Sequence, residues 1–372
     1  MNDSKPCIAL VCPNLINASP INALTAIANH LSRFFTIKIF VYGERNNSDA
    51  LILKRLASNG VEVSYFGSSK VTKVVRVKYW LENQILKNNV CLAISFLFKA
   101  DLALSLVSNK IIKVCSLRDM LHESLLISHG KLVAELANHL QKLALRRFDK
   151  LITMSDEMTD YYALRHEIEV TKLVCIPNFL DESRLKAANK HVSDIYFNNN
   201  DPVLISISSL IKRKRIDKLM DFVERLNSES FPVNLLIIGD GPLAEELKLR
   251  SRDNICLSHR VRFVGQLRNP YDALKEADIF VSASESEGLS RSILESLYFN
   301  VPCLVSGIPS NVSLSLYTKG LYLFQEYEDF KKNIIEIISN KVRSKLPIQH
   351  TEAVGLNSYT NLIQMLISSP IQ

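Results

Sequence analysis

The sequence lacks the paired cysteines and histidines on which structural zinc sites and disulfide frameworks depend. Its seven cysteines are scattered over 372 residues, without a C-x-x-C pair or a spacing typical of zinc ligands. We therefore expect reduced thiols in a cytoplasmic protein. No apolar run is long enough to cross a bilayer, and residues 1–12 show no signal-peptide cleavage pattern.

The common phosphate-binding motifs are also missing. Residues 7–43 follow a strand–helix–strand pattern like that of a nucleotide-binding fold, yet they contain neither G-x-G-x-x-G nor G-x-x-x-x-G-K-[ST]. NAD enzymes and P-loop NTPases are therefore disfavoured. No D-x-D triplet occurs, and we expect neither a metal site nor a cofactor. The net charge of +7 suits anionic ligands or an anionic membrane surface and does not indicate a nucleic-acid partner.

The length and composition favour two domains. A chain of 372 residues with 47% hydrophobic content can build two separate cores. Residues 183–202 are polar and aperiodic, which is typical of a linker. The predicted domains are residues 1–182 and 203–350, followed by a C-terminal helix within 351–372. We expect the ligand site in the cleft between the two domains.

The most informative stretch runs from Ala277 to Ser306. An apolar strand pattern leads into a loop that holds Glu287, and a helical pattern that holds Glu295 follows before the next apolar run. Strand–loop–helix–strand units of this kind usually form a parallel sheet. In such a sheet, the loop after the first strand faces the ligand crevice.

The residue types in this stretch suit a nucleotide-sugar diphosphate. Carboxylates such as those of Glu287 and Glu295 accept hydrogen bonds from sugar and ribose hydroxyls. Unpaired amides at a helix N-terminus attract anions, and a glycine lets the backbone approach the ligand closely. The amides concerned are those of Gly288, Leu289 and Ser290. A structural interpretation remains open, because Ser292-x-x-Glu295 fits a capping box and Glu287 fits a solvated loop residue.

The E-x7-E spacing from Glu287 to Glu295 resembles the signature of retaining glycosyltransferases of the GT-B fold, family 4, also known as glycosyl transferases group 1. Gly239-Asp240-Gly241-Pro242 is similar to the family's G-D-G-P turn. The segments 148–155 and 174–181 are similar to those that end the family's first domain. The resemblance implies an α/β protein with two Rossmann-like, doubly wound domains facing across a cleft, and a C-terminal helix that packs back on the first domain.

The resemblance also covers a basic segment of the second half. Residues 208–217 (SSLIKRKRID) are similar to the family's G-R-L-x-x-x-K-G-x-D. Lys214 falls on the lysine that neutralises donor phosphate charge, whereas Ser209 replaces the usual arginine. The candidates to compensate for that arginine are Lys212, Arg213 and Arg215. Taken alone, such a charge run also fits a solvated helix start.

Three further positions follow from the family pattern. Val264 and Gly265 fall at the end of the strand that borders the base in family members. Ser19 lies where the family has a glycine-rich loop facing the donor phosphates, so it is a candidate donor to the ligand, with loop filler as the alternative.

Arg118 follows an apolar strand pattern in the first half, where family members have a polar residue near the donor sugar or the acceptor. Its guanidinium can form a fork with a phosphate. The alternative is an ordinary salt bridge with Asp119 or Glu123.

Two stretches, residues 70–87 and 131–150, combine basic and apolar residues. They fit surface helices with a core-facing stripe. They also fit contact with an anionic bilayer that holds a lipid-linked acceptor, which would place the protein at the inner face of the cytoplasmic membrane.

The resemblance implies a hexosyltransferase that needs no metal and retains the anomeric configuration. Its donor would be a UDP-sugar or GDP-sugar, with UDP favoured, and its acceptor a glycan or lipid-linked oligosaccharide of surface polysaccharide or lipopolysaccharide synthesis. Glu287 would contact the sugar, Glu295 the ribose, and Lys214 the leaving diphosphate.

The main alternative is a nucleotide-sugar-binding partner subunit with a degenerate site, which the changes at Ser209 and Ser19 favour. A nucleotide-sugar epimerase matches the order of motifs less well, and a phosphorylase would require a longer chain with a cofactor-binding lysine.

Overall fold

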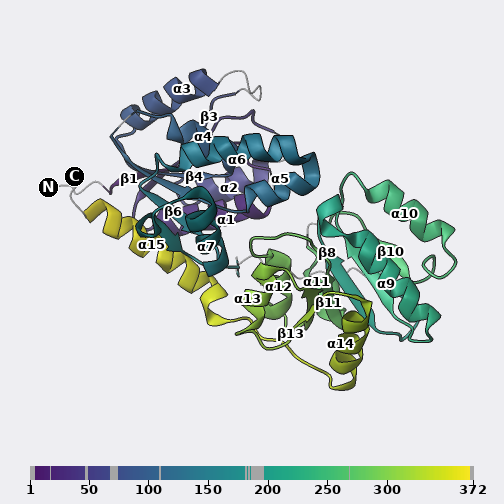
Figure 1. The fold of residues 1–372 in the computed structure, drawn as a ribbon. Coiled ribbons are helices and arrows are strands. Elements are labelled where there is room, and N and C mark those ends of the chain that lie inside the picture. Colours follow the sequence, from purple (N-terminus) through teal and green to yellow (C-terminus); the bar gives the residue numbers. More distant parts are fainter. Residues whose placement is uncertain are drawn as a thin grey trace. The chain divides into compact units, whose positions relative to one another are not determined.

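The computed structural model describes residues 5–16, 18–46, 49–67, 74–108, 110–180, 182, 185, 197–267 and 269–368. The described residues form two compact units (Figure 1). The first unit comprises those within Met1–Leu125, Gly130–Asp181 and Glu352–Gln372. The second comprises those within Leu126–His129 and Glu182–Thr351.

A parallel sheet with strand order β3-β2-β1-β4-β5-β6-β7 forms the centre of the first unit. Its strands are β1 (Cys7–Cys12), β2 (Thr36–Val41), β3 (Glu62–Tyr65), β4 (Val90–Phe96), β5 (Ile112–Ser116), β6 (Lys150–Thr153) and β7 (Leu173–Cys175). The helices along this part of the chain are α1 (Ser19–Leu31), α2 (Ala50–Ala57), α3 (Val74–Lys87), α4 (Phe98–Ser105), α5 (Leu121–His129), α6 (Lys131–Leu145) and α7 (Asp156–His166). All six residues of β1 are buried, as expected for a parallel strand covered on both faces.

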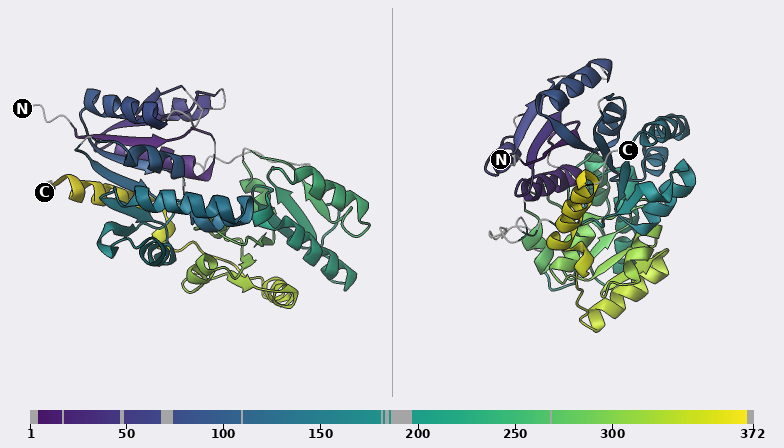
Figure 2. Two further views of the ribbon diagram at one scale, coloured as in Figure 1. Left: turned by 45° about the horizontal axis from the view of Figure 1, so that its top comes forward. Right: turned by 90° about the vertical axis from the view of Figure 1, so that its left-hand side faces the viewer.

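The C-terminal helix α15 (Glu352–Ser368) completes the core of the first unit. Tyr359 and Ile363 are buried in the same apolar cluster as Ile8 of β1. The Tyr359 hydroxyl lies 3.2 Å from Ser116 Oγ at the end of β5. Figure 2 shows α15, in yellow, alongside this unit. The last helix of the chain is therefore built into the domain that the first residues begin.

The second unit repeats the plan with strand order β10-β9-β8-β11-β12-β13. Its strands are β8 (Val203–Ile207), β9 (Asn234–Ile238), β10 (Val261–Phe263), β11 (Ile279–Ser282), β12 (Cys303–Ser306) and β13 (Leu321–Phe324). Its helices are α9 (Ile216–Ser228), α10 (Ala244–Asp253), α11 (Tyr271–Glu276), α12 (Arg291–Tyr298), α13 (Pro309–Ser315) and α14 (Tyr327–Ser339). Both sheets are parallel, so the predicted Rossmann-like α/β architecture is confirmed.

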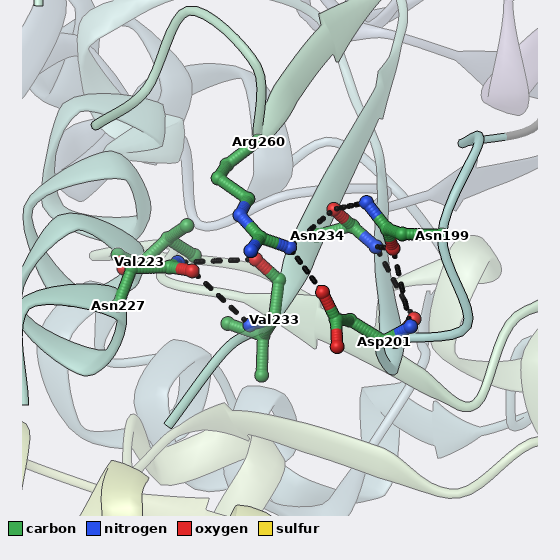
Figure 3. Close-up of polar contacts among 7 residues, drawn as sticks. All are labelled: Asn199, Asp201, Val223, Asn227, Val233, Asn234 and Arg260. Carbon is green, nitrogen blue, oxygen red and sulfur yellow. Dashed lines mark hydrogen bonds and ion pairs between the residues drawn. The ribbon is translucent and has the colours of Figure 1, made fainter. Parts of the chain in front are cut away.

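A polar network fixes the chain where it enters the second sheet (Figure 3). The fully buried Asn234 side chain donates from Nδ2 to Asn199 Oδ1 at 2.6 Å and to the Asp201 carbonyl at 3.2 Å. Arg260 forms an ion pair with Asp201 and donates to Asn234 Oδ1 at 3.4 Å. Because buried polar groups need such partners, the network holds the end of the predicted linker against β9 and β10.

Candidate functional site

The candidate residues of the second unit follow β8 and β11, two adjacent strands at which the strand order reverses. Ligands of open α/β sheets bind outside the carboxyl ends of the strands at such a reversal. The two loops are joined by a backbone hydrogen bond of 3.0 Å from the Glu285 amide to the Arg213 carbonyl. Ser292 on α12 donates from Oγ to the Ile207 carbonyl at 2.9 Å, which ties the start of α12 to the end of β8.

Glu287 lies in the middle of this loop pair. Its side chain is 12% exposed and accepts hydrogen bonds at Oε1 from Lys214 Nζ and from Ser284 Oγ, the latter at 2.9 Å. Arg213 Nη1 lies 3.3 Å from Glu287 Oε2. Burial opposes ionisation of Glu287, but the positive charges of Lys214 and Arg213 outweigh it and hold its pKa below the ordinary value. The interpretation of Glu287 as a solvated loop residue is therefore wrong.

The contacts of the basic segment distinguish the residues proposed to replace the family arginine. Arg213 also donates to the Ser286 carbonyl and so lies within the site. Arg215 points elsewhere and pairs with Asp217 and, at 2.7 Å, with Glu285. Lys212 and Ser209 are exposed. The alternative interpretation of this segment was a solvated start of a helix. It does not hold for Lys214 and Arg213, because their side chains are only 15% and 14% exposed.

The helix α12 begins next to Glu287. Ser290 is its N-cap residue and forms no side-chain capping bond, while the Ser292 hydroxyl donates to the end of β8 instead of capping. The capping box is therefore not formed, and the first N–H groups of α12 have no intrahelical acceptor. Gly288 and Leu289 are buried directly before this turn.

Glu295 lies one helical turn further into α12 and is 8% exposed. The buried Tyr271, at the start of α11, donates from its hydroxyl to Glu295 Oε1 at 3.3 Å. The sequence offered only the position of this tyrosine before Ala277-Asp278 as a signal, and it did not predict the contact. This hydrogen bond helps to orient the Glu295 carboxylate.

The glycine-rich turn after β9 has a structural role. A Cβ atom on Gly239 would lie 1.8 Å from the Ser208 carbonyl oxygen, and one on Gly241 would lie 2.5 Å from that of Leu210. The Gly239 amide donates to the Gly265 carbonyl at 2.9 Å, and the Val264 amide donates to Ile237 at 3.1 Å. The turn therefore lies against the loop after β8. The role of Val264 and Gly265 in binding the nucleotide base stays a prediction.

The first unit contains a pocket of about 360 Å³ at the carboxyl ends of β1, β4 and β5. Arg118 lines it and donates from Nη2 to Asn178 Oδ1 at 2.9 Å. Gln141 of α6 also lines it, and its buried Oε1 has no hydrogen-bond partner among the described residues. The backbone of Ser19 begins α1, but its side chain lies outside the described residues, and so do Lys70 and Lys73 of the first basic stretch.

Asp101 forms part of the wall of the same pocket. Ser95 Oγ donates to its carboxylate at 2.6 Å, and burial raises its pKa to about 7. Within the described ranges, no group of three or more histidine, cysteine or carboxylate side chains is arranged to hold a metal ion. In those same ranges, no helix combines the length and the apolar composition needed to cross a bilayer.

The chain is similar to known glycosyltransferases in sequence and in fold. Residues 189–353 match the family described as "Glycosyl transferases group 1". The chain is 26% identical to the O-antigen biosynthesis glycosyltransferase WclY of Escherichia coli over 223 residues. This alignment covers 58% of each protein. Over 109 residues the chain is 29% identical to the UDP-Gal:alpha-D-GlcNAc-diphosphoundecaprenol alpha-1,3-galactosyltransferase of Escherichia coli, covering 29% of this chain and 28% of that enzyme. The chain thus spans less than two thirds of the length of these relatives.

The similarity to solved structures extends over nearly the whole chain. HepE of Anabaena, in complex with UDP-glucose, superposes with a TM-score of 0.73 at 15% identity, covering 98% of this chain and 100% of HepE. At this identity the superposition shows the fold. It confirms the predicted two-domain GT-B fold, and the match to group 1 glycosyl transferases covers residues 189–353.

Proposed function

We propose that this protein is a hexosyltransferase that moves a sugar from a nucleotide-diphosphate donor, with a UDP-sugar favoured, to a glycan or lipid-linked acceptor of a surface polysaccharide. The observation that carries the proposal is Glu287, largely shielded from solvent and paired with Lys214 and Arg213 directly before the N-terminus of α12. Support comes from relatives whose names give O-antigen biosynthesis and transfer from UDP-Gal.

The geometry supports the following division of roles. As the sugar–phosphate bond breaks, negative charge develops on the leaving diphosphate. Lys214, Arg213 and the first amides of α12 would stabilise that charge, and each such preorganised contact is typically worth about 3–4 kcal/mol in the transition state. Glu287 would accept hydrogen bonds from sugar hydroxyls, and Glu295, oriented by Tyr271, from the ribose.

We further propose retention at the anomeric carbon without a metal ion. The acceptor oxygen would attack the face that the diphosphate leaves, and the leaving phosphate would take up the acceptor's proton. In this scheme no protein side chain acts as a nucleophile, and the positive charge that a metal would bring is supplied by Lys214 and Arg213.

The first-unit pocket is our proposed binding site for part of the acceptor. The Arg118 guanidinium is anchored by Asn178, and the unpaired Gln141 Oε1 can accept a hydrogen bond from a hydroxyl group. A pocket that includes an anchored guanidinium and an unpaired amide oxygen suits a sugar that carries hydroxyls near a phosphate.

Contact with an anionic membrane is the third element of the proposal. Helix α6 exposes a row of apolar side chains at helical spacing, with Leu132 88% exposed and Leu136 64% exposed, and Leu140 and Leu143 continue the row. Basic residues, Lys131, Lys142, Arg146 and Arg147, flank it. Apolar residues beside basic ones are typical of helices that lie in the membrane interface.

The test is incubation of the protein with UDP-glucose, UDP-galactose, UDP-N-acetylglucosamine and GDP-mannose, with release of UDP or GDP as the readout. Slow hydrolysis of one donor is expected, and Glu295→Gln should abolish it. Glu328→Gln is the matched control, because Glu328 is a 74% exposed carboxylate of the same unit, on α14. Binding of a nucleotide sugar without turnover would favour the partner-subunit alternative, and the absence of both would refute the proposal.

A further inference from the structure

Arg291, the first residue of α12, is the starting point. The residue is 9% exposed, and among the described residues its guanidinium forms no hydrogen bond or ion pair. A guanidinium carries five N–H donors and stays charged, and a buried charge without a partner is costly. The guanidinium nitrogens are not among the fully enclosed unpaired atoms, so solvent touches part of the group.

The position of Arg291 on the helix gives the direction of its side chain. Residues four apart lie on one face of a helix, so Arg291 and Glu295 share a face and are separated by about one 5.4 Å turn. Long side chains in helices lean toward the N-terminus, which favours a position of the Arg291 guanidinium at the N-terminal end of α12. The two residues therefore present a cation near the helix N-terminus and a carboxylate one turn further in.

Arg291 differs from the cations around Glu287 in that it forms no ion pair with a described residue. Lys214 and Arg213 are already paired with Glu287, so part of their charge is compensated before any ligand binds. Arg291 has no such partner among the described residues, and Ser209 is an exposed hydroxyl where the family resemblance predicts an arginine. Among the described residues, the start of α12 thus holds a guanidinium outside any ion pair, next to amides that also favour anions.

We propose that Arg291 binds the diphosphate of the nucleotide donor and supplies the positive charge that is missing at Ser209. In a nucleoside diphosphate the ribose is linked directly to the phosphates, and Glu295 and Arg291 offer a hydroxyl acceptor and an anion ligand in that order along one helix face. The inference rests on the proposed function, because it assigns a ligand group to the same site.

The experiment compares a nucleoside diphosphate with its nucleoside. Affinities of UDP and GDP are measured by calorimetry, and those of uridine and guanosine by ligand-observed NMR, for the wild-type protein, Arg291→Met, Arg291→Lys and Arg225→Met. Arg225 is a matched control, since it is a 53% exposed arginine of the same unit that pairs with Glu229 and Glu328. The melting temperature of each unliganded variant is recorded as well.

We expect Arg291→Met to weaken the nucleoside diphosphate that the wild type binds by 10- to 100-fold, equal to about 1.4–2.8 kcal/mol. Affinity for the matching nucleoside should change less than twofold, and Arg291→Lys should retain part of the diphosphate affinity. Because the substitution removes an unpaired buried cation, the melting temperature without ligand should be equal to or above that of the wild type. Arg225→Met should bind both ligands as the wild type does.

Two kinds of result would overturn the inference. The first is that Arg291→Met binds the diphosphate like the wild type, or that it loses affinity for the diphosphate and the nucleoside by the same factor and has a lower melting temperature. In either case Arg291 is a packing residue, and the proposed function stands. If the wild-type protein binds neither UDP nor GDP, the proposed function fails, and the role of Arg291 fails with it.

Discussion

Replacing Glu287 with glutamine separates stability, ligand binding and turnover. In the unliganded protein the Glu287 carboxylate is paired with Lys214 and Arg213. Glutamine has a similar shape and can still accept from Ser284, but it removes the negative charge between the two cations. We expect the variant to be less stable, to bind UDP or GDP more tightly, and to lose turnover.

The size of the stability effect follows from the contacts. At the 3.3 Å separation of Arg213 Nη1 and Glu287 Oε2, Coulomb's law with an effective dielectric constant of about 20 gives about 5 kcal/mol. Partial solvent access and the hydrogen bonds that glutamine keeps reduce this value, so we expect a loss of about 2–3 kcal/mol in the free energy of unfolding. Release of two cations from an internal anion should tighten diphosphate binding about tenfold, while loss of the sugar contact should lower turnover about 100-fold.

The pH dependence of the unfolding free energy gives an independent test of whether Glu287 stabilises the protein. The pKa of Glu287 is lowered in the folded protein, so the unfolded chain binds more protons in acid. The stabilisation is therefore present above the unfolded carboxyl pKa of about 4.3 and is lost as the pH falls through the lower folded value. The difference in unfolding free energy between the wild type and Glu287→Gln should be largest near pH 7 and should shrink below pH 4.

Urea denaturation at several pH values, calorimetry with UDP and GDP, and donor hydrolysis form the assay. Glu285→Gln is the control, because Glu285 lies in the same loop but pairs with Arg215 rather than with Lys214. Weaker diphosphate binding by Glu287→Gln than by the wild type would contradict this expectation, and so would unchanged turnover.

Three further predictions follow. Asp101→Asn should become more stable than the wild type as the pH rises from 4 to 7, with a difference in unfolding free energy of about 1–4 kcal/mol above pH 7. The reason is that the wild type must ionise a buried carboxylate whose folded pKa is about 7, whereas the unfolded chain ionises it freely. Urea denaturation at pH 4 and pH 8 measures the difference. Leu132→Ser with Leu136→Ser should reduce co-sedimentation with anionic vesicles at least fivefold by removing exposed apolar area. Tyr271→Phe should weaken donor binding about fivefold, since it removes a hydrogen bond of about 1 kcal/mol to Glu295; titration calorimetry measures it.

Each of these has a contradicting result. Equal stability gains for Asp101→Asn at pH 4 and pH 8 would show that ionisation is not involved. Wild-type protein that stays in the supernatant with anionic vesicles at low salt would exclude the membrane contact. Tyr271→Phe with unchanged donor affinity would show that Glu295 is held in place without the tyrosine.

The fold could be predicted from the sequence because the local sequence pattern agrees with the tertiary structure in β1 and in the turn after β9. The run Cys7–Cys12 is apolar throughout, and the structure buries it on both faces of a parallel sheet. The turn Gly239–Pro242 is similar to the family's G-D-G-P turn, and the close approach of the Ser208 carbonyl to Gly239 explains why a glycine is needed.

The site was readable only in part because its key contacts join residues distant in sequence. The spacing of Glu287 and Glu295 located the loop and the helix, but 73 positions separate Lys214 from its partner Glu287. No local pattern distinguishes Arg213, which reaches Glu287, from Arg215, which reaches Glu285. The burial of Arg291 was equally hidden, because a charged residue at a helix start usually faces solvent.

The proposed binding of a nucleotide sugar by Glu287, Glu295 and the start of α12 can be tested directly. Its most direct measurement is UDP or GDP release from the nucleotide-sugar panel by the wild type, Glu295→Gln and Glu328→Gln, with each protein's folding verified by its melting temperature. We predict turnover of one donor by the wild type and Glu328→Gln, and none by a fully folded Glu295→Gln. Equal turnover by all three proteins would contradict the account.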